Sequence, residues 1–456
     1  MTAHRLMILF TAIGLVSIGL VACGTGPDDM AGNRTTAPEW FAGRVQYEVN
    51  VPEFSEDGTL DGVIPRLDGL DDLGLEVLVL GPIHPRGGVS PADTFPAHPY
   101  SVTDHLAVAE DLGGMPAFAR LVGAAHARGM RIVLDMVLNH GAIDHVAVVE
   151  HPEWFARDEG GQLTRKVDDW RTIADFVHQD PAVRAFHQQV LKTWLARGVD
   201  GFRFLHANLM SDDYWREILA GVRRSHPEAY LVADVKNPKF LDLGFDGIYK
   251  PQFFEASTFG ILDDMAQLGL RDDIWYGAVD TVYGIGHRGT IFLEDRFLVR
   301  ATETFPWPRG KGYAAVLLTI PGTPKLYNGQ EWGISSQPRL TRATRLAPGQ
   351  GHEGWAAHYR DLLRLRTGSE ALRIGEARWI EAEERELMVY TREIPGETIL
   401  VAANLTDTGP EFTLPDDLAT ARWHEWEDGA FAGEATDLEG KIRVEPCDYR
   451  AWRLAR

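Results

Sequence analysis

The stretch that decides the fold of this chain is Gly201-Phe202-Arg203-Phe204-Leu205. It is a short apolar run interrupted by one arginine, which is typical of a strand buried on both faces of a parallel sheet. Because side chains alternate across a strand, Arg203 and Leu205 point to the same face. A buried guanidinium on that face needs a carboxylate, and we expect Asp135 to be its partner.

Strand-like and helical patterns alternate on both sides of this stretch. Strands are predicted at residues 47–51, 77–80, 132–134, 201–205, 231–233, 247–249, 290–293 and 325–327. Helices are predicted at residues 60–73, 115–128 and 354–365, where apolar residues recur at helical spacing. This alternation predicts a parallel sheet with right-handed crossovers. Eight such units close into a (β/α)8 TIM barrel, which we expect over residues 43–370.

Two segments depart from the alternation. Residues 139–180 form a long excursion after the third predicted strand. Beyond the barrel, Glu386–Thr391 and Thr398–Asn404 alternate like antiparallel strands and are joined by Pro395-Gly396. The sequence therefore predicts a small inserted domain at 139–180 and a C-terminal antiparallel β-sandwich at 371–456.

Length, charge and cysteine content narrow the class of protein. A chain of 456 residues suits a barrel with an appended module. The net charge of -21 argues against nucleic acid and anionic membrane surfaces as partners, but it leaves a neutral ligand such as a sugar unaffected. The two cysteines are Cys23 and Cys447, and no C-x-x-C or histidine-rich metal motif occurs. We expect neither a disulfide nor a bound metal.

The N-terminus has the pattern of a targeting segment. An apolar run from Leu6 to Val21 ends in Leu20-Val21-Ala22-Cys23. This ending resembles the bacterial lipoprotein signal box, in which the cysteine receives a diacylglyceryl chain. We therefore expect a signal peptide at 1–22, lipidation of Cys23 and a tether at 23–42. The protein would then lie in the bacterial cell envelope, anchored to the outer membrane or the cell surface; an uncleaved membrane anchor is the alternative.

Four stretches in the right order resemble the α-amylase family of glycoside hydrolases (family 13). Leu134–His140 is similar to the family's Asp-x-Val-x-Asn-His signature, and Gly201–Leu205 is similar to its Gly-Phe-Arg-x-Asp strand. Pro321–Glu331 is similar to its last-strand signature, and Phe54–Gly58 resembles its first barrel loop. The resemblance implies a TIM barrel whose excursion is "domain B". It also implies an α-glucan or oligosaccharide as ligand.

The resemblance also locates three positions at which the family keeps catalytic carboxylates. Leu205 stands at the nucleophile, Phe297 at the third carboxylate, and Asp234 at the acid, where the family has glutamate. A retaining glycosidase needs two carboxyl groups roughly 5–5.5 Å apart. Leucine cannot form a glycosyl-enzyme. The pattern therefore predicts that standard retaining activity is lost and that Asp234 is a degenerate acid position.

The resemblance implies a sugar-binding set of Tyr100, Asp104, Asp135, His140, Arg203 and Arg296. In this set Tyr100 corresponds to a stacking tyrosine and Arg296 replaces a histidine. We expect Arg296 to pair with Asp234, which would keep Asp234 ionised and a poor proton donor. For His140, ligand contact and a satisfied buried polar role are both open. Asn139 occupies a position that binds calcium in many amylases, so calcium is an open alternative to the absence of any cofactor.

The sequence is compatible with three functions. The first is a non-catalytic lipoprotein that binds an α-glucan or oligosaccharide, or that acts as a partner in an envelope complex. The second is a divergent hydrolase or transglycosylase that uses Asp234 as acid and another carboxylate such as Asp295. The third is a structural surface protein without sugar affinity. We expect the first, because losing one positioned acid or base costs about 10²–10⁴ in rate and several groups are missing here.

Overall fold

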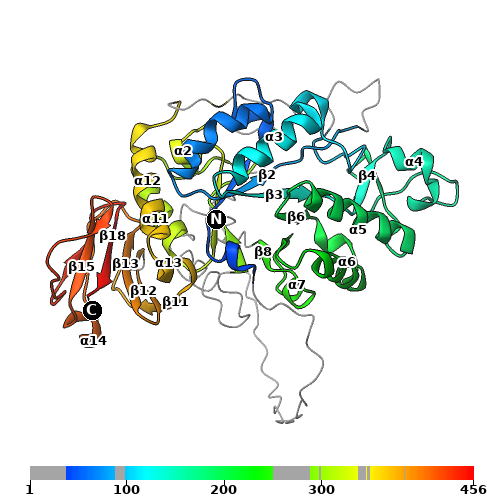
Figure 1. Ribbon diagram of the computed structural model, residues 1–456. Coiled ribbons are helices and arrows are strands. Elements are labelled where there is room, and N and C mark those ends of the chain that lie inside the picture. The colour runs from blue at the N-terminus through cyan, green and yellow to red at the C-terminus, as the bar shows by residue number, and fades with distance from the viewer. Residues whose placement is uncertain are drawn as a thin grey trace, which may run out of the picture. The chain divides into compact units, whose positions relative to one another are not determined.

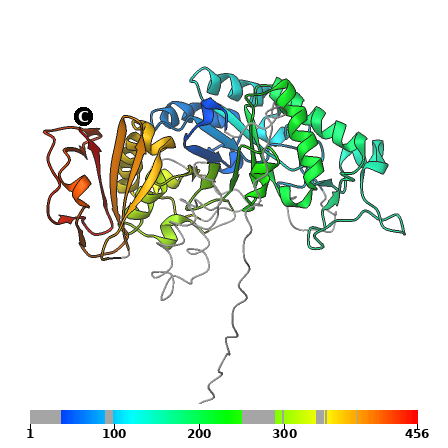
Figure 2. The ribbon, with the colours of Figure 1, turned by 90° about the horizontal axis from the view of Figure 1, so that it is seen from below.

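Eight parallel strands close into a barrel in the order β1-β10-β9-β8-β7-β6-β3-β2 (Figures 1 and 2). The computed structural model describes residues 37–87, 98–249, 288–296, 299–336, 346, 350–384 and 386–455. The barrel strands are β1 (Gln46–Val49), β2 (Val77–Leu80), β3 (Arg131–Met136), β6 (Gly201–Leu205), β7 (Tyr230–Asp234), β8 (Gly247–Tyr249), β9 (Gly289–Ile291) and β10 (Thr323–Tyr327). The predicted (β/α)8 barrel is confirmed.

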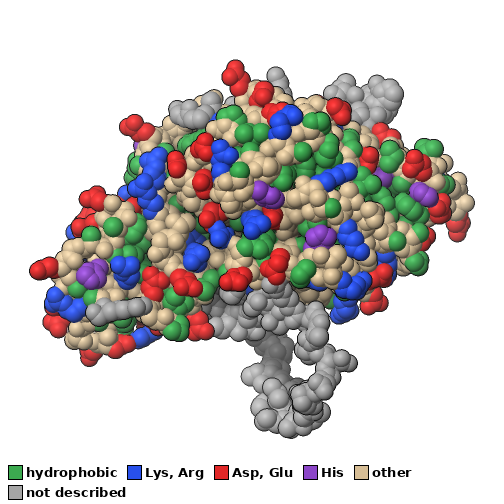
Figure 3. Space-filling model, viewed as in Figure 1, with side chains coloured by type: hydrophobic (Ala, Val, Ile, Leu, Met, Phe, Trp, Pro, Cys, Tyr) green, Lys and Arg blue, Asp and Glu red, His purple; other side chains and the backbone are tan. Residues whose placement is uncertain are grey.

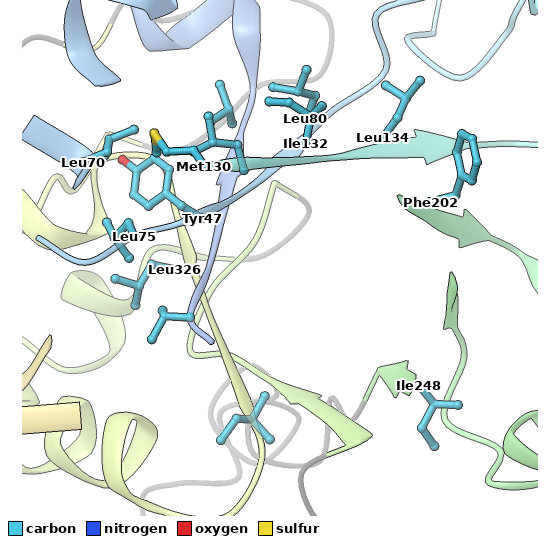
Figure 4. Close-up of a cluster of buried hydrophobic side chains, with 14 of the residues drawn as sticks. Tyr47, Leu70, Leu75, Leu80, Met130, Ile132, Leu134, Phe202, Ile248 and Leu326 are labelled. Carbon is cyan, nitrogen blue, oxygen red and sulfur yellow. The ribbon is translucent and has the colours of Figure 1, made fainter. Parts of the chain in front are cut away.

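The outward faces of the barrel strands pack against helices in the main hydrophobic core. Leu80, Ile132, Leu134 and Phe202 lie on neighbouring strands of this core and are fully buried (Figure 4). Each such side chain contributes about 1.5–3 kcal/mol relative to exposure. The helices of this part are α1 (Val51–Phe54), α2 (Leu67–Asp71), α3 (Gly114–His126), α5 (Pro181–Ala196), α6 (Asp212–Ser225), α7 (Lys239–Asp242), α10 (Ala301–Thr304), α11 (Gly310–Thr319) and α12 (Glu353–Thr367).

One predicted helix is broken in two. The segment 60–73 begins as a 3₁₀ helix over Asp61–Arg66 and continues as α2. Pro65 lies inside the 3₁₀ segment, and it lacks the N–H group that a continuous α-helix would use there. The prediction of a single helix was therefore wrong in its inner part, while its apolar face is buried as expected.

The interior of the barrel is filled by side chains at its amino-terminal end. Phe41 stacks on Tyr230 with ring centroids 3.6 Å apart. Val77, Val133 and Val232 belong to the same buried cluster. Apolar side chains therefore fill the amino-terminal end of the barrel interior. The polar residues lie toward the carboxyl ends of the strands, where TIM barrels carry their functional sites.

The excursion after β3 has a small core of its own. It carries β4 (His140–Ala142), which pairs antiparallel with β5 (Ile173–Asp175), and the short helix α4 (Val146–Glu150). Its buried cluster consists of Ala147, Phe155, Ala174, Phe176 and Val183. This inserted unit lies where the sequence places the excursion.

The C-terminal part is antiparallel, with one six-stranded sheet and one two-stranded sheet (Figures 1 and 2). The strands are β11 (Glu376–Ile380), β12 (Leu387–Ile394), β13 (Glu397–Asn404), β14 (Glu411–Phe412), β15 (Trp423–Glu427), β16 (Ala430–Phe431), β17 (Ile442–Arg443) and β18 (Tyr449–Leu454). Two short helices, α13 (Glu370–Ile374) and α14 (Asp416–Ala419), accompany them. Phe412 and Ile442 of the small sheet share one core with Val389 and Trp452 of the large sheet.

Two fully buried arginines bind carbonyl groups at the carboxyl end of helix α11, and one of them, Arg392, connects the barrel to the C-terminal sheet. Arg366 of α12 donates to the carbonyl oxygen of Leu318 at 3.0 Å. Arg392 of β12 donates to the carbonyl oxygens of Thr319 at 2.6 Å and Gly375 at 2.8 Å. Leu318 and Thr319 end helix α11, where the helix dipole places partial negative charge. The acceptors are backbone groups, and burial lowers the pKa of Arg392 to about 10.

The surface carries acidic and basic side chains interspersed over the face seen in Figure 3. Over the ranges that the structure describes, no helix has the length and apolar character needed to cross a membrane. The predicted signal peptide, Cys23 and Phe297 lie outside the described residues.

Candidate functional site

A network of buried charges lies inside the barrel. Glu48 of β1 accepts hydrogen bonds from Arg203 at 3.1 and 3.2 Å, from Arg296 at 2.9 and 2.5 Å, and from Lys325. Asp135 of β3 accepts from Arg203 at 2.5 and 2.6 Å and from Arg296 at 3.0 Å. None of these five side chains is more than 3% exposed. Burial alone would raise the pKa of Glu48, but the three cations hold that pKa well below its usual value.

The predicted pair between Arg203 and Asp135 is confirmed, and it is bidentate. Glu48, the second carboxylate of the network, was not predicted from the sequence. In the strand Gln46–Val49 a lone glutamate looks like a solvent-facing residue, but here the alternate face of the strand is the barrel interior. The available signal for this buried carboxylate was Glu48 within the predicted strand 47–51, two positions after Gln46.

Tyr100 is part of this network. Its hydroxyl donates to Asp135 at 2.9 Å, and the Arg296 guanidinium lies over its ring at 5.4 Å. The ring is 3% exposed and shares a small apolar cluster with Val137 and Leu205. The face that the resemblance assigns to sugar stacking is therefore covered by side chains of the protein itself.

Leu205 and Asp234 occupy paired positions at the ends of β6 and β7. Leu205 is 2% exposed and faces the barrel interior, as alternation predicts. Asp234 is partly exposed. Burial, with the charge of Asp295 adding to it, raises the pKa of Asp234 to about 6. Within the described residues its carboxyl group accepts no hydrogen bond and forms no ion pair.

The expected pair between Arg296 and Asp234 is wrong, and so is the expectation that it lowers the pKa of Asp234. Arg296 instead points to Glu48 and Asp135, because two buried carboxylates attract a guanidinium more strongly than one. Gly81, which follows β2, leaves the space for it. A Cβ atom at Gly81 would lie 2.9 Å from Nη1 and 3.1 Å from Nη2 of Arg296.

His140 and Asp104 serve local structure. The side-chain amide nitrogen of Asn139 donates to Nδ1 of His140 at 2.7 Å, and Nε2 of His140 donates to the carbonyl oxygen of Tyr100 at 3.1 Å. Burial lowers the pKa of His140 to about 3, so its ring is a satisfied neutral group. Asp104 accepts the backbone N–H of Leu106 at 2.7 Å in a tight turn.

Asn139 is the residue at which the sequence left calcium as an open alternative. Oδ1 of Asn139 is buried without a hydrogen-bond partner there, and an amide oxygen is a suitable calcium ligand. Calcium takes six to eight oxygen ligands, usually with carboxylates among them. Among the described residues no group of three or more His, Cys, Asp or Glu could hold a metal ion.

Two aromatic residues near the ends of the strands were not anticipated. The rings of Trp170, from the excursion, and His206 lie 4.6 Å apart, and Trp170 meets His140 edge-on at 5.5 Å. His206 directly follows Leu205 and has a left-handed backbone with φ 54°. Both rings are partly exposed, so they offer aromatic surface to a ligand. A histidine at the end of a barrel strand was the sequence signal for this pair.

The protein resembles known proteins in sequence and in fold. The family model described as "Alpha amylase, catalytic domain" matches residues 32–170. Alpha-amylase 3 of Dictyoglomus thermophilum is 25% identical over 453 aligned positions, which cover 83% of this chain and 88% of that protein. Neopullulanase 2 of Thermoactinomyces vulgaris is 25% identical over 473 positions, which cover 92% of this chain and 78% of that protein.

Solved structures show the same fold at lower identity. The noncanonic maltogenic α-amylase AmyB of Thermotoga neapolitana has a TM-score of 0.78 at 22% identity, covering 91% of this chain and 99% of that one. The α-amylase of Geobacillus thermoleovorans, in complex with acarbose, has a TM-score of 0.75 at 20% identity, covering 91% and 99%.

Proposed function

We propose, from the resemblance of the chain to the α-amylase family in sequence and fold, that it binds α-glucan oligosaccharides without hydrolysing them through a glycosyl-enzyme. The observation that carries the proposal is Leu205. It is buried at the end of β6, in register with Asp234 on β7. A retaining mechanism needs carboxyl groups at two such neighbouring positions, and only one is present.

The charge network supports the same conclusion. Arg296 covers Tyr100 and binds both Glu48 and Asp135, so the innermost part of the site is occupied by the protein's own cation. A sugar ring would have to displace a guanidinium held by two buried carboxylates. Binding is therefore proposed at the outer part of the site, where Trp170 and His206 are partly exposed.

Oligosaccharide binding is supported by the relatives. They are named amylases and a neopullulanase, and one solved relative carries acarbose. Aromatic rings next to unpaired polar groups are the usual composition of sugar sites, because pyranose rings present both apolar faces and hydroxyls. Trp170, His206 and Asp234 provide such a combination at the carboxyl ends of the strands.

The test is calorimetry of the full-length protein with maltoheptaose, combined with product analysis of the same mixtures. We expect binding without products. Trp170→Ala should weaken binding about tenfold or more, since a stacked ring is worth about 1–3 kcal/mol. Trp379→Ala, in the C-terminal sheet, is the control and should leave it unchanged. Release of maltose with retained configuration, abolished by Asp234→Asn, would overturn the proposal.

One observation favours a second candidate, a divergent hydrolase. Because burial raises the pKa of Asp234 to about 6, this carboxyl group is suited to donate a proton near neutral pH. Asp295 contributes to that shift through its charge. An inverting pair with carboxyl groups about 6.5–9.5 Å apart would need no covalent nucleophile. Products of inverted configuration that disappear in both Asp234→Asn and Asp295→Asn would establish this alternative.

We further propose that the protein is anchored in the bacterial envelope through a lipid on Cys23, where it meets its glucan or a partner protein. The support is the apolar run that ends in Leu20-Val21-Ala22-Cys23. A site for neutral sugars is also compatible with the strongly negative net charge of the chain.

A further inference from the structure

Five buried histidines lie where the excursion meets the barrel: His84, His105, His145, His178 and His187. His105 Nδ1 lies 3.0 Å from His145 Nε2. His105 Nε2 lies 2.8 Å from the carbonyl oxygen of Val137, which follows β3. His145 is the N-cap residue of α4 in the excursion. The two rings thus form a relay from the excursion to the barrel.

The hydrogen-bond directions fix the protonation of this relay. The backbone N–H of Ala147 donates to His145 Nδ1 at 3.1 Å, so this nitrogen holds a lone pair and Nε2 carries the proton. His145 Nε2 therefore donates to His105 Nδ1, and His105 Nε2 donates to Val137. Both rings are neutral and use both nitrogens. A further proton on either ring would bind to Nδ1 and would break the hydrogen bond that this nitrogen accepts.

The surroundings of the relay are mainly aromatic. The rings of Phe155, Phe176 and Phe186 lie 5.7–6.4 Å from His145. Trp194 lies 5.3 Å from His84 and donates through its indole N–H to the carbonyl oxygen of His105. An imidazolium in this mainly aromatic setting loses its hydration, which disfavours the charged form of the ring.

Among the described residues, few charged groups face the five histidines. Some of these charges raise the pKa of a histidine and others lower it. Asp104 and Asp144 act on His145, and Asp104 and Arg197 act on His84. Lys166 and Arg184 act on His178, while His187 shares a hydrogen bond with the Tyr214 hydroxyl at 2.8 Å. Burial dominates: it lowers the pKa of His84, His145 and His178 to about 4 and the pKa of His105 and His187 well below its usual value.

The relay ends at the floor of the candidate site. Val137 accepts the final hydrogen bond through its carbonyl oxygen, and its side chain packs with Tyr100 and Leu205. The next carbonyl oxygen, that of Leu138, accepts from His178 at 3.0 Å. Movement of the histidines would therefore release the segment that follows β3.

We propose that the His145–His105 relay is an acid-sensitive latch that holds the excursion on the barrel and opens at mildly acidic pH before the barrel unfolds. The sign follows from linkage. In the closed form these histidines bind protons only near pH 4 or below, whereas in an opened form they bind them near pH 6.5. The closed form is most stable, relative to the opened form, above about pH 6.5. Its relative stability decreases as the pH falls toward 4.

The test is hydrogen exchange of the full-length protein between pH 7.5 and 4.5, with rates corrected for their intrinsic pH dependence. We expect protection across 138–187 to fall at least tenfold between pH 6.5 and 4.5, while α12 and the β12–β13 hairpin keep theirs. The double variant His105→Gln/His145→Asn retains polar side chains that do not titrate in this range. It should keep the excursion protected at pH 4.5. His226→Gln, outside the cluster, is the control and should behave as the native protein.

Two results would overturn the latch. One is loss of protection in 138–187 and in α12 at the same pH in the native protein. The other is an unchanged transition in the double variant. If that variant fails to fold, an NMR titration of the native protein tests the latch instead. The signals of the buried histidine rings must titrate at the pH at which protection is lost. Titration of these rings near pH 6.5 without any loss of protection would contradict the proposal.

Discussion

Replacement of Glu48 by glutamine tests the buried charge network most directly. Glu48→Gln keeps the shape of the side chain but removes one of two carboxylates that face Arg203, Arg296 and Lys325. Three cations would then be balanced by Asp135 alone. Removing one partner of a buried ion pair costs about 3–5 kcal/mol, because an uncompensated charge stays behind. That is a large share of the about 5–15 kcal/mol by which folded proteins are stable.

Urea unfolding followed by tryptophan fluorescence measures this loss. With a slope of roughly 3 kcal/mol per molar, the midpoint should fall by about 1–1.7 M at pH 7. Because the cations hold the pKa of Glu48 well below its usual value, its contribution is present above the unfolded-state pKa. The contribution is lost as the pH falls through the folded-state value. The difference between native protein and variant should therefore shrink in acid.

The matched control is Glu76→Gln. Glu76 pairs with Arg44 at the surface, and both side chains are about a third exposed or more. Such a pair contributes about 0–1 kcal/mol. If Glu48→Gln loses no more stability than Glu76→Gln, Glu48 does not neutralise the three cations, and the charge network does not stabilise the barrel.

Three further outcomes are expected. Because burial raises the pKa of Asp234 to about 6, the cost of this carboxyl group to stability builds up between the unfolded-state pKa of about 4 and pH 6 and is complete above it. Asp234→Asn should therefore be about 2–3 kcal/mol more stable than the native protein at pH 7.5 and about equal to it at pH 4 in urea unfolding; a destabilised variant at pH 7.5 would contradict this. Gly81→Ala should cost about 1–3 kcal/mol in the native background and clearly less in an Arg296→Met background; additive costs would show that the two residues do not compete for space. Metabolic labelling with a fatty acid should tag the native protein and not Cys23→Ser, and equal labelling of both would refute the lipid anchor.

Much of the barrel could be read from the sequence because strand signals are local. The strand at Val77–Leu80 is found with its predicted bounds, and Gly201–Leu205 likewise. The pairing of Arg203 with Asp135 follows from alternation, since a buried cation must meet a carboxylate on an adjacent strand. The break at Pro65 was predictable in principle, because proline removes an N–H from a helix interior.

The failures concern long side chains whose direction depends on distant residues. Arg296 reaches Glu48 and Asp135 because Gly81, more than two hundred positions earlier, leaves space for its guanidinium. No local pattern around Arg296 contains that information. The relay of His105 and His145 could not be predicted for the same reason. Its geometry depends on the N-cap of α4 and the end of β3 coming together in the fold. Burial of Asp234 also reverses the electrostatic effect expected from a neighbouring cation.

The carbonyl-bound arginines at the end of α11 bear on how the chain completes its fold during synthesis. Arg392 binds the carbonyl oxygen of Thr319 in the barrel, and its strand lies in a sheet where β18 sits between β13 and β15. β18 leaves the ribosome after the other described strands, yet it occupies an inner position of that sheet. The carbonyl group of Thr319 therefore lacks its arginine partner until translation has nearly ended, whereas Leu318 can already bind Arg366 of α12. We infer that the barrel and the sheet mature together, and that a chain cut near residue 370 would leave the Thr319 carbonyl group at the end of α11 without its Arg392 partner.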